Sequence, residues 1–248
     1  MNDNIVVYEV IRIINSKPLF VKDHYNRLLN TLNSYIKKPV LSYTTFIDNI
    51  NETIKNNNIL NGNIRLETGY SGSDIIKLSS QQVPHKYPTE KDYREGVKTI
   101  TIKYERKNPQ DKIWDSELRY KVDNIIKTED VYEIIYVNNE NNITEGSRSN
   151  IFFINDNYLY SAPFYQVLSG ITRKYVIETA QTNDIKFVEA LIYQDNISSF
   201  DAAFISGTSP KILPISYINN IKFNVKNVTL QKLISEFNKL IESNISNN

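Results

Sequence analysis

The side chains of this chain best suited to covalent chemistry are a lysine and a glutamate that lie 33 residues apart. Lys112 precedes a helical pattern, and Glu145 opens the segment Glu-Gly-Ser-Arg-Ser-Asn. A lysine amine attacks a carbonyl only when unprotonated, so burial or nearby positive charge must lower its pKa from about 10.4. A carboxylate can keep a neighbouring ring nitrogen protonated. Taken singly, each residue is more often a solvated lysine or a turn glutamate.

Two turns of small residues further along the chain are suited to binding phosphate. Gly170-Ile171-Thr172 precedes a helical run, and Gly207-Thr208-Ser209 follows a strand pattern. A helix start offers free backbone N–H groups, and a threonine hydroxyl adds a donor. Arg27 supplies a planar guanidinium that also fits phosphate. An amine, a carboxylate and phosphate-binding turns in this order could together hold pyridoxal 5'-phosphate (PLP), with the amine as its Schiff-base partner.

Composition excludes several other kinds of site. The 248 residues contain no cysteine, which rules out disulfides, thiolate catalysis and cysteine-based zinc sites. His24 and His85 are the only histidines, which argues against a histidine-rich metal site, so we expect no metal. The net charge of +1 does not favour nucleic acid or a membrane as partner. The N-terminus lacks the pattern of a secretory signal, and we expect a cytoplasmic protein.

The pattern of elements predicts two α/β subdomains, residues 1–105 and 106–248, with Lys112 carried by the larger second one. In the first, a strand over Val6–Ile14 precedes two helices, the second capped by Ser42, and a strand pair over residues 64–70 and 75–78. Residues 81–94 show little periodicity. We expect the cofactor to bind between the subdomains.

The second subdomain is predicted to alternate strands with helices. A helix beginning near Trp114 comes first, a helix over residues 172–182 lies in the middle, and an apolar stripe capped by Thr229 forms the last helix. The predicted strands cover residues 131–137, 150–154, 158–161, 185–191, 202–205, 212–217 and 221–223.

These segments together resemble the class IV aminotransferases, the PLP enzymes of fold type IV. The family includes branched-chain aminotransferases, D-amino acid aminotransferases and 4-amino-4-deoxychorismate lyases. Residues 8–12, Tyr-Glu-Val-Ile-Arg, look like its Phe-Glu-Thr-Ile-Arg segment, and residues 24–28 are similar to its His-x-x-Arg-Leu motif. The resemblance runs over nearly the whole chain and implies an α/β (α+β) fold like that of D-amino acid aminotransferase.

The resemblance assigns a role to each matching residue. Lys112 falls at the position of the Schiff-base lysine, and Glu145 at that of the glutamate facing the pyridine nitrogen. Leu168 corresponds to the residue that packs on the cofactor ring. The phosphate ligands it implies are Arg27, Ile171, Thr172 and Thr208. The family also implies a small-molecule amino substrate and a homodimer.

Three departures from the family pattern are visible. Only Met1 to Val7 stand where the family usually has an Asp-Arg-x-x-x-Tyr-Gly-Asp-Gly stretch. The Arg-x-His carboxylate trap of D-amino acid aminotransferases is absent around residues 67–70, which argues against a D-amino acid substrate. Arg148 replaces a residue that is small in many members. Arg148, and Gly207 beside the second turn, are candidates for contact with substrate.

The sequence therefore predicts transamination of an amino acid through a Schiff base at Lys112. An alternative is a 4-amino-4-deoxychorismate lyase that releases pyruvate to give 4-aminobenzoate. An alternative of another class is a catalytically weak PLP-fold protein that acts as a binding or structural dimer. The short N-terminal segment motivates that alternative, and the retention of Arg27, Lys112 and Glu145 opposes it.

Overall fold

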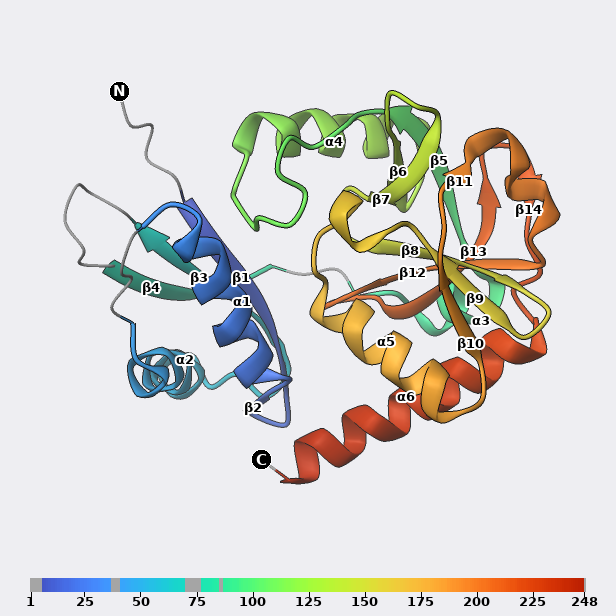
Figure 1. Ribbon diagram of the computed structural model, residues 1–248. Coiled ribbons are helices and arrows are strands. Elements are labelled where there is room, and N and C mark those ends of the chain that lie inside the picture. Colours follow the sequence, from blue (N-terminus) through green and yellow to red (C-terminus); the bar gives the residue numbers. More distant parts are fainter. Residues whose placement is uncertain (1–5, 37–40, 70–76, 85–86, 248) are drawn as a thin grey trace. The chain divides into compact units, whose positions relative to one another are not determined.

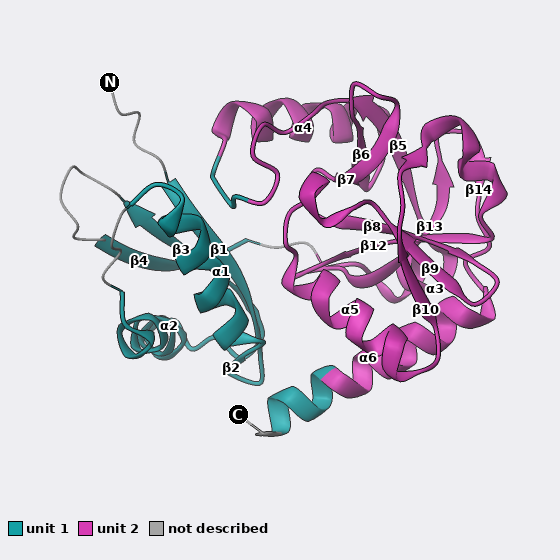
Figure 2. Ribbon diagram, in the orientation of Figure 1, with its two compact units in different colours: residues 1–86, 111–114, 241–248 teal, residues 87–110, 115–240 magenta. Residues whose placement is uncertain are grey.

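A computed structural model describes residues 6–36, 41–69, 77–84 and 87–247 (Figure 1). The chain divides into two compact units (Figure 2). Unit 1 contains residues 1–86, 111–114 and 241–248, and unit 2 contains residues 87–110 and 115–240. The two units are described separately below.

Unit 1 is built, in its described part, on a four-stranded sheet of order β2-β1-β3-β4 covered by two helices. Strand β1 spans Val6–Ile14 as predicted, and the side chain of Ser42 caps the second helix by accepting the Thr45 N–H at 3.0 Å. The predicted link between the next two strands lies outside the described residues. The remaining elements are β2 Lys17–Pro18, α1 Val21–Asn33, α2 Tyr43–Asn56, β3 Gly62–Gly69 and β4 Lys77–Val83.

Strand β1 has two faces with different tasks. Val7, Ile11 and Ile13 lie on the face that packs against apolar side chains of α1 and α2, and each of the three is at most 2% exposed. Because side chains alternate along a strand, Glu9 shares this covered face, whereas Tyr8 lies on the opposite one. The alternation therefore places a charged residue inside the core of unit 1.

Residues 111–114 belong to unit 1 because they pair with β1. Val7 and Ile113 form an antiparallel bridge, the Tyr8 N–H donates to the Lys112 carbonyl at 3.2 Å, and the Trp114 N–H donates to the Val6 carbonyl at 3.0 Å. The division therefore differs from the boundary expected between residues 105 and 106. It assigns Lys112 to the smaller unit, while residues 97–103 pair with strands of unit 2.

Unit 2 contains a closed barrel. Its ten-stranded sheet includes the path β8-β12-β13-β5-β6-β7, and an added β7–β8 pairing joins the two ends of that path. Among the described residues these six strands are β5 Val97–Lys103, β6 Glu133–Val137, β7 Asn142–Gly146, β8 Asn150–Asn155, β12 Ala202–Gly207 and β13 Lys211–Ile218. Apolar side chains that include Val97, Ile135, Ile151, Phe153 and Leu213 form one core cluster of these strands.

Shorter strands and helices surround the barrel of unit 2. Phe152 on β8 and Phe204 on β12 point away from the barrel interior. Their rings stack with centroids 5.0 Å apart. The surrounding elements are α3 Glu90–Glu95, α4 Ser116–Glu129, β9 Tyr158–Ser161, η1 Phe164–Gln166, α5 Ile171–Thr182, β10 Lys186–Glu189, β11 Ile192–Tyr193, η2 Gln194–Ser199, β14 Ile221–Lys222 and α6 Val228–Asn247. No helix in the described ranges is both long and apolar enough to cross a bilayer.

Three local predictions differ from the structure. Residues 81–94, which showed little periodicity in the sequence, include most of helix α3. Thr89 and Asp92 fix the start of this helix by a reciprocal capping box. The strand predicted over residues 185–191 is shorter in the structure, where β10 covers only Lys186–Glu189 and the next strand, β11, begins at Ile192. Thr229 does not cap the last helix: its hydroxyl donates to the Asp156 carbonyl, and Asn227 accepts the Leu230 N–H at 3.1 Å instead.

Candidate active site

A bulge in β7 decides which way Glu145 points. Ile135 and Val137 on β6 are opposed by Gly146 and Ile143 on β7, so two steps along β6 correspond to three along β7. Ile143 and Ile135 both lie in the barrel core. The extra residue reverses the alternation, so Glu145 does not share the face of Ile143. The bulge turns a carboxylate out of the apolar interior.

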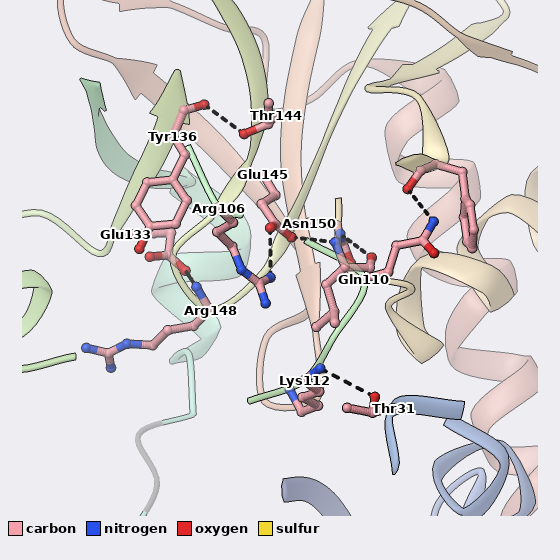
Figure 3. Close-up of polar contacts among 12 residues, drawn as sticks. Thr31, Arg106, Gln110, Lys112, Glu133, Tyr136, Thr144, Glu145, Arg148 and Asn150 are labelled. Atoms are coloured by element: carbon pink, nitrogen blue, oxygen red, sulfur yellow. Dashed lines mark hydrogen bonds and ion pairs between the residues drawn. The ribbon is translucent and has the colours of Figure 1, made fainter. Parts of the chain in front are cut away.

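Glu145 closes the barrel and holds a loop at the same time (Figure 3). It pairs with Asn150 across the β7–β8 junction, and its side chain is 4% exposed. Arg106 donates from Nη1 to Oε1 at 2.9 Å, and the Leu168 N–H donates to Oε2 at 2.9 Å. Asn150 donates from Nδ2 to the Leu168 carbonyl at 3.1 Å. Glu145 and Asn150, the pair that closes the barrel, therefore bind both the N–H and the carbonyl of Leu168.

The loop fixed at Leu168 leads directly into helix α5. Gly170 is its N-cap residue and contributes no side-chain hydrogen bond, so Ile171 and Thr172 begin a helix that no side chain caps. A methyl group on Gly170 would overlap Oδ1 of Asn150, so a larger residue there would displace the Asn150 side chain. An uncapped helix start carries orphan N–H groups and a positive dipole end, both suited to an anion.

A buried hydroxyl lies in the same row of the sheet as Glu145. Ser206 pairs directly with Asn150 across β8 and β12, and directly paired residues share a face. Its side chain is fully buried, and its Oγ has no hydrogen-bond partner among the described residues. Gly207 and Thr208 follow at the end of β12, where a methyl group on Gly207 would come within 3.3 Å of the Pro210 ring.

Lys112 lies in unit 1 on the face of β1 that carries Tyr8. Its backbone N–H donates to the Thr31 hydroxyl at 3.4 Å (Figure 3), and its carbonyl accepts the Tyr8 N–H. Its Nζ lies 4.6 Å from the centroid of the Tyr8 ring. Hydrogen bonds at the N–H and the carbonyl of Lys112, and the Tyr8 ring beside its amine, thus restrict where the lysine side chain can reach.

Arg27 is held by a buried network within unit 1. Its Nε donates to Oε1 of Glu9 at 2.7 Å and its Nη2 to Oε2 at 2.6 Å, a bidentate pair. Nδ1 of His24 lies 2.7 Å from Oε2 of Glu9. Burial acts to raise the pKa of Glu9, but the charges and hydrogen bonds of Arg27 and His24 overcome it and lower that pKa to about 2. Glu9 is therefore ionised at neutral pH.

Burial lowers the pKa of His24 below its ordinary 6.5, against the opposing attraction of Glu9. The positive charges of Arg27 and Lys112 lower it further. A neutral imidazole donates from one nitrogen only, so the short contact with Glu9 requires the proton on Nδ1. The network thus consists of one carboxylate, one guanidinium and one neutral histidine.

Two arginines were missed by the sequence analysis. Arg106 pairs with Glu145 across a long stretch of chain, a contact that local patterning cannot reveal. Arg65 places its guanidinium carbon 3.6 Å from the Trp114 ring centroid and 5.1 Å from that of Tyr8, the ring that Lys112 also approaches. One of its terminal nitrogens also pairs with Glu67.

Arg148, predicted as a candidate substrate contact, forms an ion pair with Asp123 of α4. Both side chains are about half exposed, at 47% and 50%. This arginine therefore lies among solvent-exposed charges of unit 2.

Comparison with known proteins decides the family. The family model described as amino-transferase class IV matches residues 6–218. The chain belongs to the class IV aminotransferases. Its similarity to a "putative branched-chain-amino-acid aminotransferase" of Methanocaldococcus jannaschii is 28% identity over 238 residues, covering 90% of this chain and 81% of that protein. A D-alanine aminotransferase of Staphylococcus epidermidis is 24% identical over 261 residues, which cover 96% and 88% of the two chains.

Solved structures confirm the fold predicted from the resemblance. A "putative 4-amino-4-deoxychorismate lyase" from Legionella pneumophila superposes on this class IV chain with a TM-score of 0.85 at 24% identity, covering 94% of this chain and 90% of that one. The fold is that of the fold type IV PLP enzymes, with a half-barrel sheet in unit 1 and a closed six-stranded barrel in unit 2. At this identity the likeness concerns the fold alone.

Class IV aminotransferases depend on PLP, and a hypothetical aminotransferase of Mycobacterium tuberculosis with TM-score 0.79 and 14% identity has been solved with PLP bound. Two observations on this chain fit that cofactor. The start of α5 has no side-chain cap, which suits a phosphate dianion, and Ser206 keeps a buried hydroxyl without a partner. The described residues contain no group of acidic or histidine side chains arranged to hold a metal ion.

Proposed function

We propose that this class IV family member is a PLP-dependent transaminase that moves the amino group of an amino acid by way of Lys112. The observation that carries the proposal is the arrangement of Glu145, turned out of the barrel by a bulge and fixed by Arg106 and the Leu168 N–H. Burying a carboxylate costs free energy because an ionised group loses its hydration. Stability alone therefore does not account for a buried carboxylate held in one place by these contacts.

Different residues of this chain have different roles in the proposed reaction. When bound, PLP supplies an electron sink for charge that develops on the substrate. Glu145 would accept a hydrogen bond from the ring nitrogen of bound PLP and favour the protonated form of that nitrogen. Lys112 would hold the cofactor through its amine, and once released it would accept and return the substrate proton. Leu168 would pack against the cofactor ring.

The phosphate of PLP is assigned to one charged side chain and two turns. Arg27 contributes a guanidinium whose direction Glu9 fixes through two hydrogen bonds. Thr172, with Ile171, contributes the start of α5, and Thr208 the turn after β12. Hydrogen bonds to charged groups are worth roughly 1.5–3 kcal/mol each. The loss of Arg27 is therefore expected to weaken PLP binding by about ten-fold or more.

Arg65 is the better of two arginine candidates for the substrate carboxylate. Each arginine is paired with a carboxylate, Arg65 with Glu67 and Arg148 with Asp123. Arg65, however, shares the Tyr8 ring with Lys112 and its side chain is 15% exposed, whereas that of Arg148 is 47% exposed. A guanidinium binds carboxylate in a planar, two-pronged manner. Gly207, next to Thr208, remains a candidate for backbone contact with the substrate.

The lyase alternative is not favoured. The lyase name comes from a structural neighbour at 24% identity, whereas the sequence relatives given above are named as aminotransferases. We also propose a homodimer, as in the family at large. The alternative of a catalytically weak structural dimer predicts no amine transfer, so the experiment below tests it as well.

The decisive variant is Glu145→Gln, which keeps the shape of the side chain and removes its charge. Glu140→Gln is the matched control, because Glu140 is an exposed glutamate near the same strand. Wild-type protein is expected to gain visible absorbance with PLP and to convert amino-acid donors in single-turnover assays. Glu145→Gln should still bind PLP, while its turnover falls by about 10²-fold or more.

Near wild-type turnover in Glu145→Gln would contradict the role of Glu145. A wild-type protein that binds no PLP would overturn the proposed function as a whole. Release of pyruvate from aminodeoxychorismate, without reaction of any amino-acid donor, would reinstate the lyase.

A further inference from the structure

We propose that Glu133 is a positioning residue that holds the turn between β7 and β8 in the shape that orients Glu145. The inference rests on the proposed function of Glu145 and goes beyond it, because Glu133 takes no part in the chemistry described above. Glu133 is the first residue of β6 and is 3% exposed.

The carboxylate of Glu133 is surrounded by donors. Oε1 accepts the Ile134 N–H at 2.9 Å and the Ser147 hydroxyl at 2.5 Å. Oε2 accepts the Arg148 N–H at 3.2 Å and the Ser149 hydroxyl at 3.0 Å. Each oxygen thus receives two hydrogen bonds, and three of the four donors come from the turn over residues 146–149.

The turn is matched to this carboxylate in shape as well as in polarity. A methyl group on Gly146 would come within 3.2 Å of Cγ and 3.3 Å of Oε2 of Glu133, and it would overlap the Ser149 hydroxyl. A larger residue at that position would therefore displace the Ser149 hydroxyl and crowd Glu133. Ser147 and Ser149 direct their hydroxyls inward, whereas the Arg148 guanidinium pairs with Asp123. The contacts with Glu133 account for the order Gly-Ser-x-Ser in the sequence.

The shape of the turn is transmitted to Glu145 because Glu145 and Asn150 are its two ends. These residues form the pair that closes the barrel, and both bind the backbone of Leu168. A shift of the turn would therefore move the Glu145 carboxylate relative to Leu168 and Arg106. Glu133 thus acts on the cofactor-facing carboxylate without touching it.

The charge of Glu133 matters as much as its size. Burial raises the pKa of Glu133, and hydrogen bonds from Ser147, the Ile134 N–H and Ser149 oppose that rise, as does the charge of Arg119. The ionised carboxylate is acceptor-only and suits four donors. A glutamine keeps the size but presents an NH₂ group on one side. In Glu133→Gln this hydrogen-bond donor faces the donors that bind the carboxylate in wild type.

The first measurement uses protein without PLP. Hydrogen exchange of peptides that cover residues 146–150 is compared between Glu133→Gln and Glu129→Gln, a control at an exposed glutamate at the end of α4. A buried donor left without an acceptor destabilises the turn that carries it. Exchange at the turn is therefore expected to be about ten-fold faster in Glu133→Gln and unchanged in the control. Equal exchange in the two variants would overturn the inference.

The second measurement separates positioning from general destabilisation. The pH midpoint of the visible absorbance of bound PLP is recorded for wild type, Glu133→Gln, Glu145→Gln and the double variant. Glu133→Gln is expected to shift the midpoint towards that of Glu145→Gln and to cause no further shift in the Glu145→Gln background. The same shift in both backgrounds would overturn this inference alone, whereas absence of PLP binding by wild type would overturn the proposed function beneath it.

A further pair of substitutions covers the case in which Glu133→Gln does not fold. Ser147→Ala with Ser149→Ala keeps the carboxylate and removes two of its four donors. This variant is expected to shift the absorbance midpoint in the same direction by a smaller amount. An unchanged midpoint in it would overturn the inference.

Discussion

At the scale of single residues, the Glu9, His24 and Arg27 network places charged side chains inside the core of unit 1. A buried charge is tolerated only when it is paired and hydrogen-bonded, and here two nitrogens of Arg27 and one of His24 surround one carboxylate. The sequence suggested phosphate binding for Arg27 but gave no sign of its partners. The alternation of side chains in the sequence indicates that the face of β1 carrying Glu9 is apolar. The sequence therefore shows Glu9 only as an exception to that alternation.

This network predicts a pH dependence of stability. The pKa of Glu9 is lowered from 4.5 to about 2 on folding. The unfolded chain therefore binds a proton in that window before the folded one does, and stability falls as the pH drops from about 4.5 to 2. The stabilisation present above pH 4.5 is about 3 kcal/mol by linkage.

We expect Glu9→Gln to be less stable than wild type at pH 7 by about 3 kcal/mol or more, since it also leaves Arg27 buried without its carboxylate. Urea unfolding at a series of pH values measures the difference, which should shrink towards pH 2. Glu52→Gln, at an exposed position of α2, serves as control. A difference between wild type and Glu9→Gln that does not change with pH would contradict the assignment.

At the scale of elements, long periodic segments were predicted well. The bounds of β1 and β9 agree with the structure, and α5 begins one residue before the predicted helix. Strand β7 was given no bounds because it is short and contains a bulge, so neither alternation nor an apolar run marks where it begins and ends. Most candidate site residues were found because they lie on turns or near element ends, whereas Arg27 lies in the middle of α1. Arg106, Arg65 and Glu133 were not found, because their partners lie far along the chain or in a tertiary cluster.

The start of α6 gives an element-scale prediction. The side chain of Asn227 accepts the Leu230 N–H, whereas Thr229 bonds to a carbonyl outside the helix. We expect Asn227→Ala to lower the free energy of unfolding by about 1 kcal/mol, as for other N-cap removals. Thr229→Val should lower it less. Denaturant titration of both variants tests this, and a larger loss in Thr229→Val would restore the threonine as the cap.

At the scale of the whole molecule, sequence order and structural unit do not coincide. Residues 111–114 and 241–248 belong to unit 1 although they are separated from its other residues by stretches of unit 2. A linear boundary drawn from composition cannot represent this, because the backbone pairing of Lys112 with Tyr8 joins segments far apart in the chain. Lys112 and Glu145 therefore belong to different units.

The central claim is that Lys112 is the residue that bonds to the cofactor. Borohydride reduction of the PLP-treated protein, followed by digestion and mass spectrometry, fixes the cofactor on whichever lysine holds it. The account predicts a single phosphopyridoxyl group on Lys112. A group on Lys121 or Lys127, exposed residues of α4, with none on Lys112 would contradict it.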